Sequence, residues 1–457
     1  MIVKRLFEPL LAQNSYLIGC AAAGEAIVID PNRDVQHYID AAEAAGLKIT
    51  CVTETHIHAD FLSGSRELAH STGARLCLSD EGDEHWKYGF DHDQKLRNGD
   101  RVAIGNVTID VLHTPGHTPE HLTFLITDGA VADQPIAAVT GDFVFVGDVG
   151  RPDLLEKAAK LTGTMHESAR TLWSSLQKLK PYPDYLQIWP GHGAGSSCGK
   201  GISAVPHSTL GYERLFNWAF TTKSEADFVT NVLSGQPDPP PYFAMMKRLN
   251  KEGPPLIDDR PIPLIMGEAL AQTATSSLVI DARPAAEFAK GHAPDTLNIP
   301  FNGSFVTWAG WLIPYTRDLY LITDRADQLD DIRAALALIG LDRIKGHFPA
   351  AAATGQETVG QMSVDELAKQ PPNAVKIIDV RNDAEWSAGH IPNAIHIPLG
   401  QLEKRINEIP ADQNVVVHCQ GGGRSAIAAS LLQKMGRKNV ANLKGGYGAY
   451  AQLKVKG

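Results

Sequence analysis

The C-terminal half of the chain contains an internal repeat, which narrows the possible folds more than any other feature. The segments DARPAAEFAKGHAPDTLNIP at 281–300 and DVRNDAEWSAGHIPNAIHIP at 379–398 agree at 9 of 20 positions, with a constant offset of 98 residues. Each copy reads as the end of a strand, a short helix and a turn. Two copies of about 100 residues are too few for a solenoid, so we expect tandem α/β domains.

Residues 1 to about 235 have a different pattern, in which strand-like runs alternate with helical ones. The strand-like runs are AIVID at 26–30, VTIDVL at 107–112, AAVTGD at 137–142 and YLQIW at 185–189. This alternation indicates sheets covered by helices. Prolines are dense at 235–243 and 253–263, so we place a linker across these two stretches. With a length of 457 residues, the chain is expected to form three domains, at 1–245, 246–355 and 356–457.

The composition is that of a globular protein, with 43% hydrophobic and 21% charged residues. No apolar run reaches the ~18 residues of a membrane helix, and the opening segment lacks the pattern of a secretory signal, so a cytoplasmic protein is expected. A net charge of -10 without a basic block argues against nucleic-acid and membrane partners. Five sparse cysteines without a CxxC pair argue against a disulfide framework and against a thiolate zinc cluster.

Candidate metal ligands follow four separate strand-like runs. The stretch THIHADF at 55–61 carries His56, His58 and Asp60. Further along, His117 lies in HTPGHTPEH, Asp142 in TGD and His192 in WPGHG. A single histidine is more often structural than a ligand, but ligand-type residues after successive strands meet at one edge of a layered sheet. The ordered set therefore predicts a metal site.

The order HxHxD, His, Asp, His closely resembles that of the metallo-β-lactamase superfamily. The resemblance implies an αββα sandwich over the first domain. In binuclear hydrolases of that superfamily, such as glyoxalase II, the residue after the HxHxD aspartate is usually a histidine of the second metal site. Here that residue is Phe61, whose ring offers no lone pair. The resemblance therefore implies a single metal ion.

Closer still is the resemblance to the persulfide dioxygenase branch, in which two histidines and one aspartate hold one iron. Carried over to this chain, the ligands of one Fe(II) are His56, His117 and Asp142. Such a set leaves three positions open for O2 and a substrate sulfur. By the same resemblance, His58, Asp60 and His192 hydrogen-bond around the ligands. His113 and His121 are expected to be structural.

Two further residues near these motifs are candidates for substrate contact. Arg151, in GDVGRPDL, resembles the arginine that meets a carboxylate of the thiol substrate in persulfide dioxygenases; the alternative is a surface salt bridge with Asp153. Cys198 lies in GHGAGSSCGKG, six residues after His192. This stretch resembles that of dioxygenase–rhodanese fusions, in which the cysteine can take up persulfide sulfur, although an inert buried cysteine is an equally good interpretation.

A second chemical motif lies in the last domain, in VVVHCQGGGRSAIAASLLQKMG. A strand leads through Cys419 into a glycine-rich loop and a helix, so backbone N–H groups can face the sulfur and lower the thiol pKa. With DVRNDAEWSAGHIPNA upstream, this resembles rhodanese over residues 360–457. The resemblance implies Cys419 and Arg424 as catalytic residues. It also implies a substrate cradle formed by Gly421, Gly422, Gly423 and Ser425.

Two other interpretations of this loop are weaker. A cysteine phosphatase would use a C-x5-R loop, which is one residue longer than the C-x4-R spacing from Cys419 to Arg424. The glycine run also lacks the GxGxxG spacing of a dinucleotide-binding loop.

The middle copy of the repeat departs from this pattern at the decisive place. Its strand LYLIT leads to DRADQ at 324–328, which predicts Asp324 at the position of the cysteine and provides no glycines. We therefore expect a noncatalytic domain that orients the two active domains or docks a partner chain.

The whole order resembles the multidomain persulfide dioxygenase–sulfurtransferase fusions of bacteria. This implies oxidation of a low-molecular-weight thiol persulfide by O2 to sulfite, with Cys419 exchanging sulfur between persulfide, sulfite and thiosulfate. A homo-oligomer, a dimer or higher, is expected by analogy. The sequence leaves open the thiol carrier, which could be glutathione, coenzyme A or bacillithiol, and the direction of sulfur flow. The alternatives are a two-zinc thioester hydrolase of the glyoxalase II type and a non-enzymatic sulfur sensor or scaffold.

Overall fold

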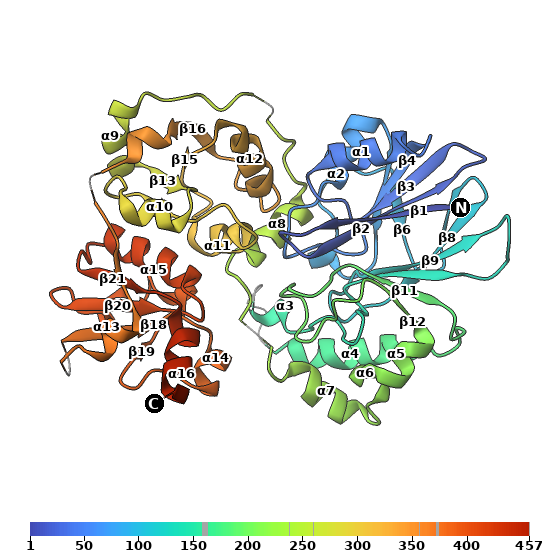
Figure 1. Cartoon of the computed structure of the whole chain (residues 1–457). Coiled ribbons are helices and arrows are strands. Elements are labelled where there is room, and N and C mark those ends of the chain that lie inside the picture. The colour runs from blue at the N-terminus through green and yellow to red at the C-terminus, as the bar shows by residue number, and fades with distance from the viewer. Residues whose placement is uncertain (158–162, 237, 259, 356, 372–373, 457) are drawn as a thin grey trace. The chain divides into compact units, whose positions relative to one another are not determined.

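The computed structural model describes residues 1–157, 163–236, 238–258, 260–355, 357–371 and 374–456 (Figure 1). The chain divides into two compact units. The first contains Met1–Asp258 with Ala334–Gly340, and the second contains Asp259–Arg333 with Leu341–Gly457. None of the helices in the described ranges is both long enough and apolar enough to cross a membrane.

Two six-stranded sheets form the centre of the first unit (Figure 1). The first sheet has the order β1 (Ile2–Glu8), β2 (Gln13–Cys20), β3 (Glu25–Ile29), β4 (Lys48–Thr53), β5 (Arg75–Ser79) and β6 (Gln94–Leu96). The second has the order β12 (Ser208–Thr209), β11 (Gln187–Pro190), β10 (Ala137–Gly141), β9 (Leu122–Asp128), β8 (Val107–His113) and β7 (Arg101–Ile104). Side chains from both sheets, such as Ile18 and Phe124, share one buried cluster. The sheets are therefore packed face to face.

Helices cover the outer faces of both sheets. Tyr38 of α1 (Val35–Glu43) and Leu68 of α2 (Ser65–Thr72) pack on the first sheet. Leu172 of α4 (Met165–Gln177) and Phe228 of α7 (Glu225–Leu233) pack on the second. The buried side chains of these helices recur at helical spacing, which explains why each presents one apolar face. The layer order confirms the predicted αββα sandwich.

The strand ends bring the candidate ligand loops to one edge of this sandwich. THIHADF follows β4, Asp142 follows β10 and His192 follows β11. Strands β10 and β11 are parallel neighbours, with Gly141 paired to Pro190, so the loops after them leave the same edge side by side. His117 lies in the loop between β8 and β9.

The segment between the two proline-rich stretches is not an extended linker. Phe243–Glu252 forms helix α8 in the first unit, with Phe243, Met246 and Asn250 buried. These three positions are spaced by three and four residues, so they lie on one helical face. The expected linker across both stretches was therefore wrong for α8, because this amphipathic pattern was overlooked.

The second unit contains two parallel sheets, as the repeat predicted. The first has the order β14 (Leu297–Asn298), β13 (Leu278–Asp281), β15 (Leu319–Thr323) and β16 (Ile344–Pro349). The second has the order β17 (Gly360–Met362), β21 (Val440–Leu443), β20 (Asn414–His418), β18 (Val375–Asp379) and β19 (Ile395–His396). Equivalent helices, α10 (Ala285–Lys290) and α14 (Asp383–Ala388), follow β13 and β18. The tandem α/β arrangement is thus confirmed.

The repeated Asp-x-Arg pair has the same structural role in both copies. Arg283 binds Asp281, and Arg381 binds Asp379, through Nε and Nη2 with all four side chains buried. A paired and hydrogen-bonded charge is the form in which buried arginine and aspartate are tolerated. The pair fixes the turn from strand to helix in each domain.

Strand register corrects the sequence comparison of the two copies. Asp281 pairs with Ile322, whereas Asp379 pairs with His418. The residue that matches Cys419 is therefore Thr323, not Asp324. The hydroxyl of Thr323 donates to the carbonyl of Arg325. A hydroxyl cannot carry a persulfide, so the expectation of a noncatalytic middle domain is unchanged.

Candidate metal centre and cysteine loop

Three predicted ligands meet in the first unit. Oδ2 of Asp142 lies 3.6 Å from Nε2 of His117 and 4.0 Å from Nε2 of His56, and all three side chains are buried. Within the part of the chain that the structure describes, Nε2 of His56 and Oδ2 of Asp142 have no hydrogen-bond partner. Buried polar atoms without partners require an explanation, and a metal ion between these atoms provides one. The residues fit a 2-His-1-carboxylate site.

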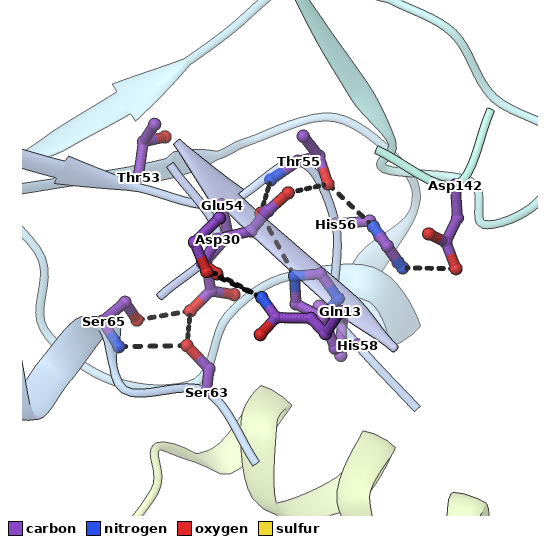
Figure 2. A network of polar contacts seen from close by, with 12 residues as sticks. Gln13, Asp30, Thr53, Glu54, Thr55, His56, His58, Ser63, Ser65 and Asp142 are labelled. Atoms are coloured by element: carbon purple, nitrogen blue, oxygen red, sulfur yellow. Dashed lines mark hydrogen bonds and ion pairs between the residues drawn. The ribbon is translucent and has the colours of Figure 1, made fainter. Parts of the chain in front are cut away.

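The second nitrogen of each ring fixes its orientation, and Figure 2 shows this contact for His56. The Thr55 hydroxyl donates to Oδ2 of Asp30, so it accepts from Nδ1 of His56 at 2.9 Å. Nδ1 of His117 donates to the carbonyl of Arg151, also at 2.9 Å. With Nδ1 protonated, Nε2 of each ring keeps its lone pair for an ion.

The charge states of these residues also suit a cation. Burial is the largest effect on both histidines and lowers the pKa of His56 and of His117, so both rings are neutral. Burial would raise the pKa of Asp142, but the charge and hydrogen bond of His192 outweigh it and hold the pKa below its usual range. Neutral imidazoles and an ionised carboxylate are the forms that bind metal.

His192 connects two carboxylates beside this set. Its Nδ1 donates to Oδ1 of Asp142 at 2.7 Å, and its Nε2 lies 2.7 Å from Oδ2 of Asp60 in an ion pair. Burial opposes protonation, but Asp142 and Asp60 raise the pKa of His192 well above its usual value. His192 is thus hydrogen-bonded to Asp142 and paired with Asp60, and the surrounding role of Asp60 and His192 stays a prediction.

His58 has a different partner. Its Nε2 lies 3.1 Å from Oδ1 of Asp30 (Figure 2). Burial lowers the pKa of His58, but the charge and hydrogen bond of Asp30 outweigh it and raise the pKa to about 8. His58 therefore braces Asp30, which in turn holds Thr55 and, through it, His56.

Cys198 is buried beside the same set. Its sulfur, an Asp60 oxygen and a His192 nitrogen lie within 4.8 Å of one another. Burial, followed by the charges of Asp60 and Asp142, raises the pKa of Cys198 well above its usual value, which favours the neutral thiol. The structure thus brings this sulfur to the metal pocket, as the sequence suggested. The sequence did not indicate that Cys198 is also a candidate metal ligand.

Residues outside the motif anchor both ends of the ligand loop. Glu54, directly before Thr55, accepts hydrogen bonds from the hydroxyls of Ser63 and Ser65 (Figure 2). The amide of Asn250 on α8 donates to the carbonyls of His58 and Phe61. The Ser63 N–H donates to the Asn250 side chain. The signal for Asn250 was a polar residue on the buried face of an amphipathic helix.

The fully buried guanidinium of Arg151 is already paired. Its Nε and Nη2 donate to the two Asp153 oxygens at 2.7 and 2.8 Å, and Nη1 donates to the carbonyl of Ser197. The Asp153 salt bridge weighed as the alternative is therefore present, although it is buried rather than on the surface. Contact with a substrate carboxylate stays a prediction. The Arg151 carbonyl has a role that the sequence did not indicate, because it orients His117.

His113 and His121 make local contacts. Nε2 of His113 donates to the Pro119 carbonyl, and Nδ1 of His121 lies 3.0 Å from the Thr114 hydroxyl. The ring of His121 stacks on His56 with centroids 5.1 Å apart. These contacts agree with the structural role expected from the sequence.

In the second unit, Cys419 lies at the start of helix α15 (Gly423–Lys434). The N–H of Gly422 donates to its sulfur at 3.1 Å, and the Ser425 hydroxyl lies 3.5 Å away. Burial would raise the pKa of Cys419, but hydrogen bonds from Ser425, Gly422 and Gly421 outweigh it and lower the pKa. The loop thus stabilises a thiolate.

A second glycine turn supports the cysteine loop from behind. The N–H of Tyr447, in α16 (Gly446–Lys456), donates to the Cys419 carbonyl. Gly446 has a φ of 57°, and a Cβ there would lie 2.2 Å from that carbonyl oxygen, so glycine is required. The Arg381 guanidinium lies 4.0 Å above the Tyr447 ring. Sequence reasoning missed this support, although the paired glycines in KGGYGAY were a signal.

Comparisons with known proteins identify the family of each of two parts of the chain. Residues 9–192 match the family model of the metallo-beta-lactamase superfamily, and residues 363–453 match that of the rhodanese-like domain. The mitochondrial persulfide dioxygenase ETHE1 of Homo sapiens is 30% identical over 199 residues, which is 42% of this chain and 68% of the human protein. The chain belongs to the metallo-beta-lactamase superfamily. The rhodanese-like domain follows in the same chain, so the predicted fusion is confirmed.

Two further relatives show which kinds of superfamily protein this chain resembles. A metallo-beta-lactamase from Staphylococcus aureus subsp. aureus COL has a solved structure that is 43% identical, with a TM-score of 0.71, and covers 76% of this chain and 99% of its own. The hydroxyacylglutathione hydrolase of Rhodospirillum rubrum is 33% identical over 177 residues, which is 39% of this chain. The matched segment spans only 60% of that hydrolase. Relatives with a dioxygenase name and with a hydrolase name are thus similarly close, so the site residues must decide between them.

Proposed function

We propose that this chain is an iron-dependent persulfide dioxygenase joined to a sulfurtransferase. The observation that carries the proposal is the buried set of His56, His117 and Asp142, next to a motif in which Phe61 takes the place of a ligand. A site for two ions would be expected to keep a ligand there. The similarity to persulfide dioxygenases and the rhodanese-like domain support the same function.

Fe(II) at these three residues would supply open positions for O2 and the outer sulfur of a thiol persulfide. The overall reaction is RSSH + O2 + H2O → RSH + H2SO3, in which both atoms of O2 end on the oxidised sulfur. The chain holds the ligand set in place through the Arg151 carbonyl on His117 and His192 on Asp142. A substrate carboxylate at Arg151 would meet a guanidinium whose Nε and Nη2 already donate to Asp153.

At Cys419 we propose a two-step sulfur transfer. The thiolate attacks the outer sulfur of RSSH, the S–S bond of the donor breaks, RS⁻ leaves with the electron pair and Cys419 becomes a persulfide. Sulfite then attacks the outer sulfur of that persulfide. Thiosulfate and a proton are released, and the Cys419 thiolate returns. The Gly422 N–H stabilises the anion at both stages, and the Ser425 hydroxyl, which also contacts Asn442 Oδ1, lies 3.5 Å from the sulfur.

The test is O2 uptake by the full chain loaded with iron under anaerobic conditions and then given glutathione persulfide. Iron is measured on the same sample. The proposal expects about one iron per chain and uptake that scales with it. Full iron occupancy without uptake of O2, for glutathione, coenzyme A and bacillithiol persulfides alike, would contradict it.

A role for Cys198 in sulfur uptake is tested separately. Cys198→Ser should change the ratio of sulfite to thiosulfate, because the thiol lies beside the metal pocket. An unchanged ratio would leave Cys198 as an inert buried residue.

One observation favours a second candidate, a two-metal thioester hydrolase. Asp60, His192 and Cys198 form a further set of ligand-type atoms, and hydroxyacylglutathione hydrolases are among the relatives. This alternative expects two zinc ions per chain and hydrolysis of S-lactoylglutathione. Metal content and that assay distinguish the two.

A further inference from the structure

Arg424, at the mouth of the Cys419 loop, is held by a carboxylate. Nη1 and Nη2 of Arg424 donate to the two oxygens of Glu385 at 2.7 and 2.6 Å. The two side chains are 24% and 25% exposed, so the pair lies where a soluble ligand can reach it. These two hydrogen bonds occupy guanidinium N–H groups that would otherwise bind an oxyanion.

The backbone of α14 fixes Glu385 in this position. Asn382 caps the helix by accepting from the Glu385 N–H, and the Glu385 carboxylate accepts from the Asn382 N–H at 3.0 Å. This reciprocal arrangement is a capping box. Glu385 is therefore a fixed negative charge rather than a mobile side chain.

Arg424 lies in the first turn of α15, two residues after Gly422, whose N–H donates to the Cys419 sulfur. The Glu385 hydrogen bonds are the largest effect that raises the pKa of Arg424, and the Cys419 thiolate raises it further. Glu385 accordingly compensates the charge of Arg424 next to the Cys419 loop.

We propose that Glu385 is a specificity-determining residue that neutralises Arg424 and so weakens binding of small sulfur oxyanions at Cys419. An oxyanion such as sulfite or thiosulfate must either displace Glu385 from the guanidinium or bind a pair with no net charge. A thiol persulfide, whose carrier supplies other contacts, depends less on this cation. The identity of these substrates rests on the proposed sulfurtransferase function, whereas the charge at the loop mouth does not.

The repeat provides a matched control. Glu287 occupies the position of Glu385 in the middle domain, but it pairs with Lys290 in a domain whose loop has no cysteine. Glu287→Gln therefore removes the same charge from the equivalent helix without changing the Cys419 loop.

The test is alkylation of Cys419 in the full chain by neutral iodoacetamide and by anionic iodoacetate, followed on the Cys419 peptide by mass spectrometry. In both reactions the thiolate attacks the CH2 carbon and iodide leaves. Glu385→Gln should raise the ratio of the iodoacetate to the iodoacetamide rate by about threefold to tenfold, as expected for one unit charge several ångström away. Glu287→Gln should leave the ratio unchanged. An unchanged ratio in Glu385→Gln, or an equal change in both variants, would overturn the inference.

Turnover separates this inference from the proposed function. In Glu385→Gln, the KM for sulfite should fall several-fold with little change in kcat. Sulfur transfer with an unchanged KM and an unchanged alkylation ratio overturns the role of Glu385. A raised ratio without sulfur transfer in any variant leaves the charge role intact and instead contradicts the sulfurtransferase.

Discussion

The ring of Phe61 packs on the ring of His58 with their centroids 4.3 Å apart. Phe61 is fully buried and follows Asp60 directly, so an apolar ring fills the place next to a candidate ligand. The Asn250 amide donates to the backbone carbonyls of both His58 and Phe61. This packing gives the loop a well-defined shape without a metal ligand at position 61.

Phe61→His should therefore add a ligand and raise the metal content from about one to about two ions per chain, because Asp60 and His192 already lie nearby. Metal analysis after incubation with Zn²⁺ and removal of the excess measures this. Phe61→Leu, which stays apolar, should remain at one ion. Two ions in the unchanged protein would contradict the prediction and indicate that Cys198 completes a second site.

His117→Ala should lose iron and O2 uptake together. The change removes one of three ligands and leaves the Arg151 carbonyl without its donor, so iron affinity should fall by more than about tenfold. Equilibrium dialysis against Fe(II) under anaerobic conditions measures the affinity. His70→Ala, at an exposed position of α2, is the control and should bind iron normally. Retention of full iron content by His117→Ala would argue against this ligand set.

Asn250→Ala tests the contribution of α8 to the ligand loop. The change leaves two buried carbonyls and the Ser63 N–H without their partner, and each unsatisfied group costs about 1–3 kcal/mol. The unfolding transition of the first unit should move to lower temperature, and iron affinity should fall. Differential scanning calorimetry with and without metal measures both. Asn231→Ala, at an exposed position of α7, is the control and should change neither the unfolding temperature nor the iron affinity. If Asn250→Ala had the same unfolding temperature and iron affinity as this control, Asn250 would not stabilise the ligand loop.

Much of the first site was predictable because ligand position follows strand position. His56, Asp142 and His192 come directly after strands, and the ends of neighbouring parallel strands share an edge. The sequence could not indicate what orients each ligand. The Arg151 carbonyl on His117 and the Asp30 carboxylate behind Thr55 depend on tertiary contacts between segments far apart in the chain.

The second unit shows a different limit. The repeat predicted both sheets, but a one-residue uncertainty in register placed Asp324 instead of Thr323 at the position equivalent to Cys419. The sequence of a strand alone does not fix its register to within one residue. The register becomes known only when the paired residues of the neighbouring strand are seen. Glu385 lies within the repeated segment, yet its contact with Arg424 spans 39 residues and required the folded chain.

Ser425→Ala should raise the pKa of Cys419. Burial alone raises the thiol pKa, and the Ser425 hydroxyl is the largest effect that opposes it, so its removal shifts the balance towards the neutral thiol. Only the thiolate reacts with iodoacetamide, so a lowered pKa in the unchanged protein should place the midpoint of its rate–pH curve below the ~8.5 of a free cysteine. In Ser425→Ala the midpoint should move to higher pH, and the reaction near pH 7 should slow. Ser387→Ala, exposed on α14, is the control and should keep the original midpoint. If Ser425→Ala gave the same midpoint as this control, the thiolate would be stabilised by the backbone N–H groups of Gly421 and Gly422 without help from the hydroxyl.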